Sequence, residues 1–136
     1  MSKVIIFTNE LGGVSVCVPT GELPIEQVQA KDIPSTIQSF IVDNSTLPEE
    51  DNDFFNSWEQ TNGVVTVNFN KAREQTKTRL RAEREPLLAA QDVLFQRALE
   101  AGSPTTAIVA EKQRLRDITD LVDSCTTTTQ LRNLHP

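Results

Sequence analysis

The chain has 136 residues and a formal net charge of −6, and 24% of its residues are charged. This length fits one domain, or a small domain with an appendage, and the acidic balance argues against broad, non-specific binding of nucleic acid. Aromatic residues are few, with six Phe, one Trp and no Tyr. We therefore expect a core built mainly from Val, Ile, Leu and Ala.

The charge is divided unevenly along the chain. Residues 1–70 hold two lysines, no arginine and ten carboxylates, a net charge of −8, whereas residues 71–136 have a net charge of +2. An acidic half and a mildly basic half are expected either to face each other or to face different partners.

Neither the cysteines nor the apolar segments indicate a metal site or a membrane span. Cys17 and Cys125 lie far apart and match no metal-binding spacing. No apolar run approaches the roughly 20 residues that cross a bilayer, and Met1 leads into a short strand without a signal peptide. We expect free thiols, a reducing cytoplasm as the place of synthesis, and no bound cofactor or metal.

The first half of the chain has the pattern of a small α+β unit. Residues 3–8 and 14–18 are β-rich runs around a glycine-containing connection, which predicts a hairpin. A short helix is expected over residues 24–32 and a third strand over residues 39–43.

A second short helix and a second hairpin complete this unit. Residues 48–51 have the chemistry of a first helical turn, because a proline is followed by carboxylates. Asn62-Gly63 is the preferred pair for a type I′ turn, so residues 58–60 and 64–69 on either side of it are predicted to pair as strands.

From residue 70 onward the apolar period becomes helical. Leu80, Leu87, Leu94 and Ala101 recur every seven residues, which predicts one long amphipathic helix. Pro86 falls inside this helix and predicts either a bend or a break near residue 85.

A second helix is expected after a short connection. Gly102 is placed to end the first helix, Ser103 to cap the next one and Pro104 to occupy its first position. Its apolar face would be formed by Ile108, Leu115, Ile118 and Val122.

The predicted fold class is therefore α+β. Residues 1–70 form a small N-terminal antiparallel β unit with short helices, and residues 71–136 form a C-terminal α-helical hairpin with a short terminal helix. We expect Leu87, Leu94 and Leu115 to pack the hairpin.

The sequence offers no catalytic arrangement. Its only histidine is His135, whereas a general base needs a positioned pocket. Asp92 and Asp117 lie among arginines, and ion pairing explains them better than acid–base chemistry does. The carboxylates of residues 49–53 lack the spacing of a calcium loop. A binding or assembly protein is predicted, and not an enzyme.

Two segments of the second half resemble a known family. They are residues 79–92 (Arg-Leu-Arg-Ala-Glu-Arg-Glu-Pro-Leu-Leu-Ala-Ala-Gln-Asp) and residues 111–118 (Glu-Lys-Gln-Arg-Leu-Arg-Asp-Ile). They resemble the phage tail assembly chaperone family of tailed bacteriophages, and the resemblance covers about residues 79–122. The first half, with its Phe-Phe-x-x-Trp-Glu stretch, is similar to the small β-rich module attached to such segments in phage proteins.

The resemblance implies a non-enzymatic tail protein that binds other tail proteins, either as a structural virion component or as an assembly factor. Such a protein would be assembled in the host cytoplasm, would be located in the virion tail, and would act as a homo-oligomer or in many copies, without membrane contact. A transient tail assembly chaperone that is absent from the mature particle is the alternative within the same system.

The candidates for partner binding are five arginines on the helices and two aromatic residues. Arginine and exposed aromatic side chains are favoured at interfaces, and the adjacent Phe54 and Phe55 cannot both point inward from one helix. The basic residues of 71–84 leave a rival from another class open, a small DNA-associated regulatory protein. The candidate residues are Arg79, Arg81, Arg84, Arg114, Arg116, Phe55 and Trp58.

Overall fold

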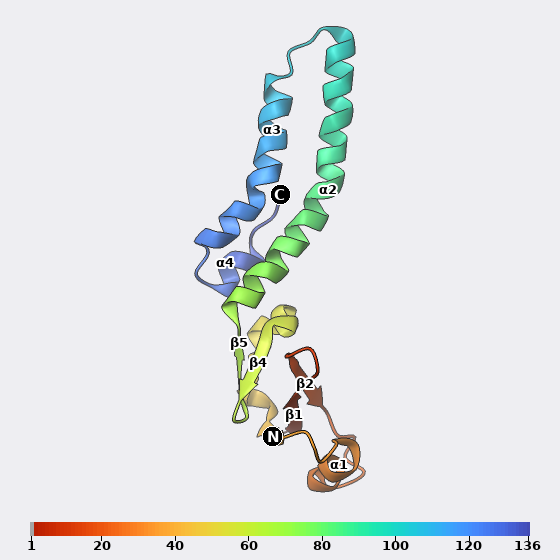
Figure 1. Cartoon of the computed structure of the whole chain (residues 1–136), viewed down its shortest axis with the longest axis vertical. Coiled ribbons are helices and arrows are strands. Elements are labelled where there is room, and N and C mark those ends of the chain that lie inside the picture. Colours follow the sequence, from red (N-terminus) through yellow and green to blue (C-terminus); the bar gives the residue numbers. More distant parts are fainter. Residues whose placement is uncertain (1) are drawn as a thin grey trace. The chain divides into compact units, whose positions relative to one another are not determined.

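The computed structural model describes residues 2–136 and confirms the mixed α+β fold, with antiparallel β structure followed by long helices (Figure 1). The chain divides into a unit that ends at Ala72 and a second unit, Arg73–Pro136, close to the boundary expected after residue 70. The elements in chain order are β1 (Lys3–Thr8), β2 (Val14–Cys17), α1 (Ile25–Asp32), β3 (Ser39–Asp43), the 3-10 helices η1 (Asn44–Thr46) and η2 (Glu49–Ser57), β4 (Trp58–Thr61), β5 (Val64–Val67), α2 (Phe69–Ala101), α3 (Thr106–Asp117), the 3-10 helix η3 (Ile118–Ser124) and α4 (Thr128–Arg132).

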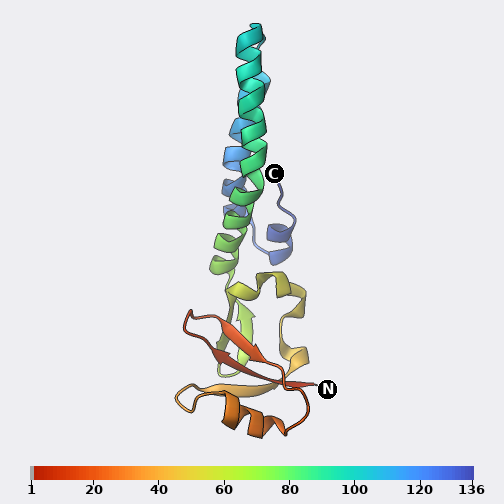
Figure 2. The same ribbon diagram turned by 90° about the vertical axis from the view of Figure 1, so that its right-hand side faces the viewer.

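Strand β1 is the centre of a three-stranded antiparallel sheet of order β2-β1-β3. Successive side chains of a strand point to opposite faces of the sheet. Val4, Ile5 and Ile6 are all buried, so β1 is covered on both faces. On one face α1 contacts β1 (Figure 2). A strand that is buried on both faces needs apolar residues at successive positions, which explains the continuous apolar run of β1.

The other face of the sheet packs against the hairpin formed by β4 and β5. The core between these two layers combines alternate residues of the sheet with one residue from each hairpin strand and one from the loop after β3. Its buried members are Val4, Ile6, Val14, Leu47, Trp58 and Val65.

The turn of the β4–β5 hairpin has the predicted type I′ backbone. Asn62 and Gly63 have φ angles of 52° and 83°, and Trp58 pairs with Val67 at the open end of the ladder. A Cβ at Gly63 would lie 3.3 Å from the side chain of Phe40. The backbone angle therefore favours glycine at this position, and the close approach of Phe40 adds to the preference.

Helix α2 is continuous through Pro86 and does not break near residue 85. The ribbon in Figure 1 changes direction near the middle of the helix. Proline removes one backbone hydrogen bond and its ring crowds the preceding turn, which accounts for a bend without a break.

The link between α2 and α3 differs from the prediction. Gly102 ends α2 with a φ of 68°, as expected, but the amide of Ser103 donates to the carbonyl of Ala98 at 2.8 Å. Ser103 thus belongs to the C-terminal cap of α2. The predicted N-cap at Ser103 is therefore wrong, because α3 begins only at Thr106, after Thr105.

The buried side chains of the second unit come from four places, namely the first part of α2, the end of α3, η3 and the segment around α4. We call these four parts together the base. Within residues 2–136, no helix combines the length and the apolar character that crossing a bilayer requires. The buried residues of the base are Thr76, Leu80, Leu115, Ile118, Val122, Cys125 and Leu131.

Candidate functional site

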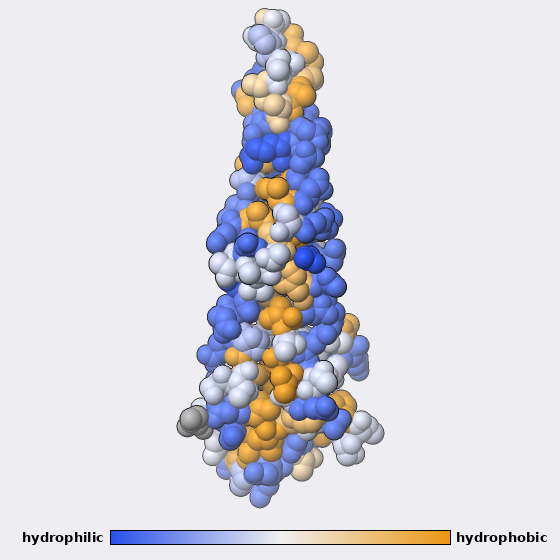
Figure 3. Space-filling model, turned by 90° about the vertical axis from the view of Figure 1, so that its left-hand side faces the viewer, coloured by the Kyte–Doolittle hydropathy of each residue, from blue (hydrophilic) through white to orange (hydrophobic). Residues whose placement is uncertain are grey.

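The part of the α2–α3 hairpin beyond the base has no core. None of the residues from Arg81 to Arg114, here called the arm, is buried. Figure 3 shows apolar residues at the surface of the second unit as far as the tip of the hairpin. A helical pair of this length without a buried residue gains little from its own packing, because most helical stability in proteins comes from burying an apolar face.

Five large apolar side chains of the arm are between 43% and 55% exposed. Leu87 and Leu94 are among them, so the prediction that they are packed inside the hairpin is wrong, whereas Leu115 is buried at its end. Of the leucines that recur every seven residues along α2, Leu80 is buried, whereas Leu87 and Leu94 are exposed. The five exposed residues are Leu87, Val93, Leu94, Leu99 and Val109.

The seam between the two helices of the arm is partly polar. Lys112 of α3 reaches across to α2, where its Nζ lies 2.6 Å from a carboxylate oxygen of Asp92 and 5.1 Å from the ring centroid of Phe95. An exposed ion pair of this kind contributes at most about 1 kcal/mol. The seam aligns the helices but does not replace an apolar core.

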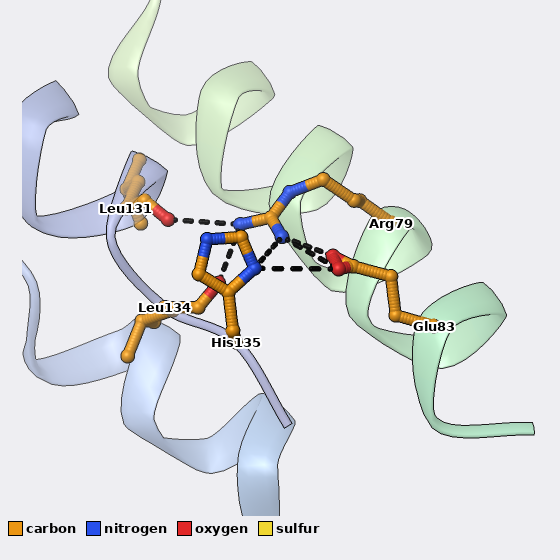
Figure 4. A network of polar contacts seen from close by, with 5 residues as sticks. All are labelled: Arg79, Glu83, Leu131, Leu134 and His135. Atoms are coloured by element: carbon orange, nitrogen blue, oxygen red, sulfur yellow. Dashed lines mark hydrogen bonds and ion pairs between the residues drawn. The ribbon is translucent and has the colours of Figure 1, made fainter. Parts of the chain in front are cut away.

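Arg79 holds the C-terminal segment on α2 (Figure 4). Its Nη2 donates to the backbone carbonyls of Leu131 at 3.1 Å and Leu134 at 2.8 Å, and its Nη1 pairs with Glu83. The ring of His135 lies at 3.4 Å from both Arg79 and Glu83. Burial raises the pKa of Glu83, but the hydrogen bond and charge of Arg79, aided by His135, outweigh it and lower that pKa below its usual value.

Two further arginines of α2 bind the ends of other elements in the base. Arg84 Nη1 donates to the carbonyl of Arg116 at 2.8 Å, near the C-terminus of α3. Arg73 Nη2 donates to the carbonyl of Cys125 at 3.1 Å, just after η3. Both arginines thus bind backbone carbonyls near the ends of α3 and η3 and tie these elements to α2.

The remaining candidate arginines are exposed. Arg81 and Arg116 are open to solvent, and Arg114 forms two hydrogen bonds to Glu111, of 2.9 and 2.6 Å. The hydrogen bond from Arg114 lowers the pKa of Glu111. Of the five candidate arginines, Arg79 and Arg84 therefore bind backbone carbonyls within the chain, Arg114 pairs with Glu111, and Arg81 and Arg116 are exposed.

The basic residues of segment 71–84 are mostly paired within the chain. Lys71 lies 2.8 Å from Glu59, and Lys77 lies 3.0 Å from Asp123, whose hydrogen bond raises the pKa of Lys77. Arg73, Arg79 and Arg84 bind carbonyls, as given above. Of the six basic residues in this segment, Arg81 is the one that is exposed and has neither a carboxylate nor a carbonyl partner among residues 2–136. This arrangement leaves few cations for a phosphate backbone.

The aromatic candidates lie in the first unit. The backbone of η2 is non-helical at Asp51 and Phe54, and this kink turns Phe54 inward, 4% exposed, and Phe55 outward, 37% exposed. The ring of Phe55 lies 4.9 Å from that of Trp58, which is 3% exposed. Phe55 is thus an accessible aromatic residue, and Trp58 belongs mainly to the core.

Asp92 and Asp117, which the sequence offered as a carboxylate pair, bind different partners. Asp117 accepts a hydrogen bond from Gln113 at 2.8 Å, whereas Asp92 pairs with Lys112. Cys17 is half-buried and Cys125 buried, and both are free thiols. In the described part of the chain, no group of three or more His, Cys, Asp or Glu side chains is arranged to hold a metal ion.

Comparison with known proteins gave no family model, no curated protein and no solved structure that matches the chain.

Sequence reasoning missed two features of the arm and base. Val93, Leu99 and Val109 lie off the seven-residue repeat, and nothing in the periodicity marked them as exposed. Arg73 was not singled out, because its partner is a backbone carbonyl, which any residue carries. The sequence did contain one indication that part of α2 stays exposed. Helix α3 has too few large apolar residues to cover both flanks of α2.

Proposed function

We propose that the chain is a non-enzymatic bacteriophage tail protein that binds other tail proteins through the arm, as a structural virion component or an assembly factor. The observation that carries this proposal is the arm itself, in which no residue from Arg81 to Arg114 is buried and five large apolar side chains are about half exposed. Contiguous exposed apolar residues mark an interaction surface, and Leu87 and Leu94, seven residues apart, lie on the same face of α2.

The base supports this division of roles. Its buried leucines and its arginine–carbonyl contacts stabilise the root of the hairpin from within the chain. The arm, by contrast, gains a core only when another protein covers it. Arg81, Arg114 and Arg116 flank the junction and would add polar contacts at the rim of such an interface.

The assignment to a phage tail rests on the resemblance of residues 79–122 to tail assembly chaperones. That segment contains the whole arm and the part of the base that joins it. Of the five exposed apolar residues of the arm, Leu87 lies in the first of the two resembling segments, and the other four lie between the segments, within the span of the resemblance. This overlap supports a role of the arm in binding tail proteins.

Mass spectrometry of purified particles of the encoding phage tests the proposal. A virion component is recovered in stoichiometric amount, whereas a chaperone is abundant in infected cells and absent from particles. Absence from both particles and tail intermediates would contradict the proposal as a whole.

A paired variant tests the arm as the binding surface. Leu87→Glu combined with Leu94→Glu is expected to abolish incorporation or co-purification with tail proteins, because two charges would enter the apolar interface. Leu11→Glu combined with Val18→Glu is the matched control, since both residues are exposed and lie in the first unit. Equal behaviour of the two double variants would show that the arm is not the binding surface.

A further inference from the structure

The first unit contains a pocket that the proposed function does not use. Its volume is about 360 Å³, and it lies among β2, the η1–η2 segment and the start of β4. Its apolar lining consists of Val16, Leu47, Phe55 and Trp58, and its polar lining of Asn44, Glu49 and Asn52.

The aromatic side of the pocket is fixed in position. Trp58 Nε1 donates to the carbonyl of Asp51 at 3.2 Å, which locks the indole against η2. The ring of Phe55 is tilted by 60° against the indole and remains 37% exposed, so that it is accessible from solvent. The pocket therefore offers a preformed aromatic surface and does not depend on a mobile side chain.

The polar side of the pocket carries a negative charge. Asn44 Nδ2 donates to Glu49 Oε1 at 3.0 Å and so holds this carboxylate beside the aromatic surface. Within residues 2–136, Glu49 forms no ion pair. Residues 32–70 contain no lysine, arginine or histidine, so the segment around the pocket adds only negative charge.

We propose that this pocket binds a cationic side chain, arginine or lysine, on an exposed segment of a partner protein. The apolar stem of such a side chain fits the lining of Val16, Leu47 and Phe55, and its charged head reaches Glu49. A cation beside an aromatic ring gains a further electrostatic attraction. The charge complementarity selects a cationic occupant over an anionic or purely apolar one, and the site is separate from the arm.

A peptide titration of the full chain tests this inference. The probe is acetyl-Gly-Ala-Arg-Ala-Gly-amide, and its control carries norleucine in place of arginine, which keeps the stem and removes the charge. Because Trp58 is the only tryptophan, its indole N–H gives a single NMR signal beside the pocket, and the side-chain amides of Asn44 and Asn52 report on the polar side.

We expect the arginine peptide to shift these signals to saturation and the norleucine peptide to bind at least about fivefold more weakly. Glu49→Gln is expected to raise the Kd of the arginine peptide by about fivefold. Glu50→Gln, which makes the same charge change outside the pocket lining, should leave binding unchanged.

Three results would overturn the inference. Equal binding of both peptides would make the site merely apolar. Equal weakening by Glu49→Gln and Glu50→Gln would reduce the effect to general attraction by an acidic segment. Signals that do not saturate would mean that the pocket takes no such side chain. Because the arm is not involved, none of these results bears on the proposed tail function.

Discussion

Leu80 and Leu94 lie on the same repeat of α2 but differ in burial, so replacing each with alanine tests where the core of the second unit ends. Leu80 is fully buried, whereas 45% of Leu94 is exposed. The substitution removes three carbon atoms, worth about 0.8 kcal/mol each when fully buried. At Leu80 a cavity adds to this loss, so we expect about 3–5 kcal/mol in total. At Leu94 roughly half of the transfer energy is lost and no cavity forms, so we expect about 1 kcal/mol.

Urea titration and thermal melting followed by circular dichroism measure the two losses. A domain of about 60–100 residues loses about 4–8 °C in Tm for each kcal/mol. Leu80→Ala should therefore lower the Tm by at least about 8 °C more than Leu94→Ala does. Equal losses would refute the reasoning, because they would mean that the arm has a core as closely packed as the base.

Three further changes have expected outcomes. Gly63→Ala should lower the free energy of unfolding by about 1–3 kcal/mol, because alanine is strained at a φ of 83° and its Cβ would crowd Phe40, and an unchanged urea midpoint would argue against this. Arg79→Lys keeps the charge but loses the fork that binds two carbonyls, so amide exchange of the C-terminal segment should become roughly tenfold faster; unaltered exchange would show that these contacts are dispensable. The hydrogen bond from Lys71 lowers the pKa of Glu59, so its stabilisation is present above the unfolded pKa of about 4.3 and is lost as the pH falls through the lower folded pKa. Glu59→Gln should therefore reduce the loss of stability below about pH 4.3, and identical acid titrations of variant and parent would contradict this.

The elements of the first unit could be predicted because their signals are local. Asn62-Gly63 adopts the positive φ angles that a type I′ turn requires, and together with the β-rich residues on either side this pair predicted the β4–β5 hairpin. The apolar run of β1 indicated a strand, although its double cover became evident only when α1 and the hairpin were placed on its two faces. Interactions between neighbouring residues thus made the helices and strands predictable, whereas the layered arrangement of these elements depends on contacts between distant residues.

The roles of the arginines could not be predicted in the same way. Arg79 binds backbone carbonyls 52 and 55 residues further along the chain, and Arg84 binds carbonyls 31 and 32 residues away. Every residue carries a backbone carbonyl, so the sequence does not distinguish an arginine that binds a distant carbonyl from an arginine that is exposed on the surface. Spacing on α2 gave the positions of these side chains but not their targets.

The seven-residue repeat of α2 shows what periodicity encodes and what it leaves open. It marks one face of the helix as apolar, and Leu80 on that face is buried in the base while Leu87 and Leu94 are not. Polar residues at positions 87 and 94 would suit a helix that stays in water, because they expose no apolar area. Leucine at both positions is instead suited to a face that becomes covered. Since no residue of the arm is buried within the chain, a covering protein would account for this choice of residues. This agrees with the proposal that the arm binds another protein.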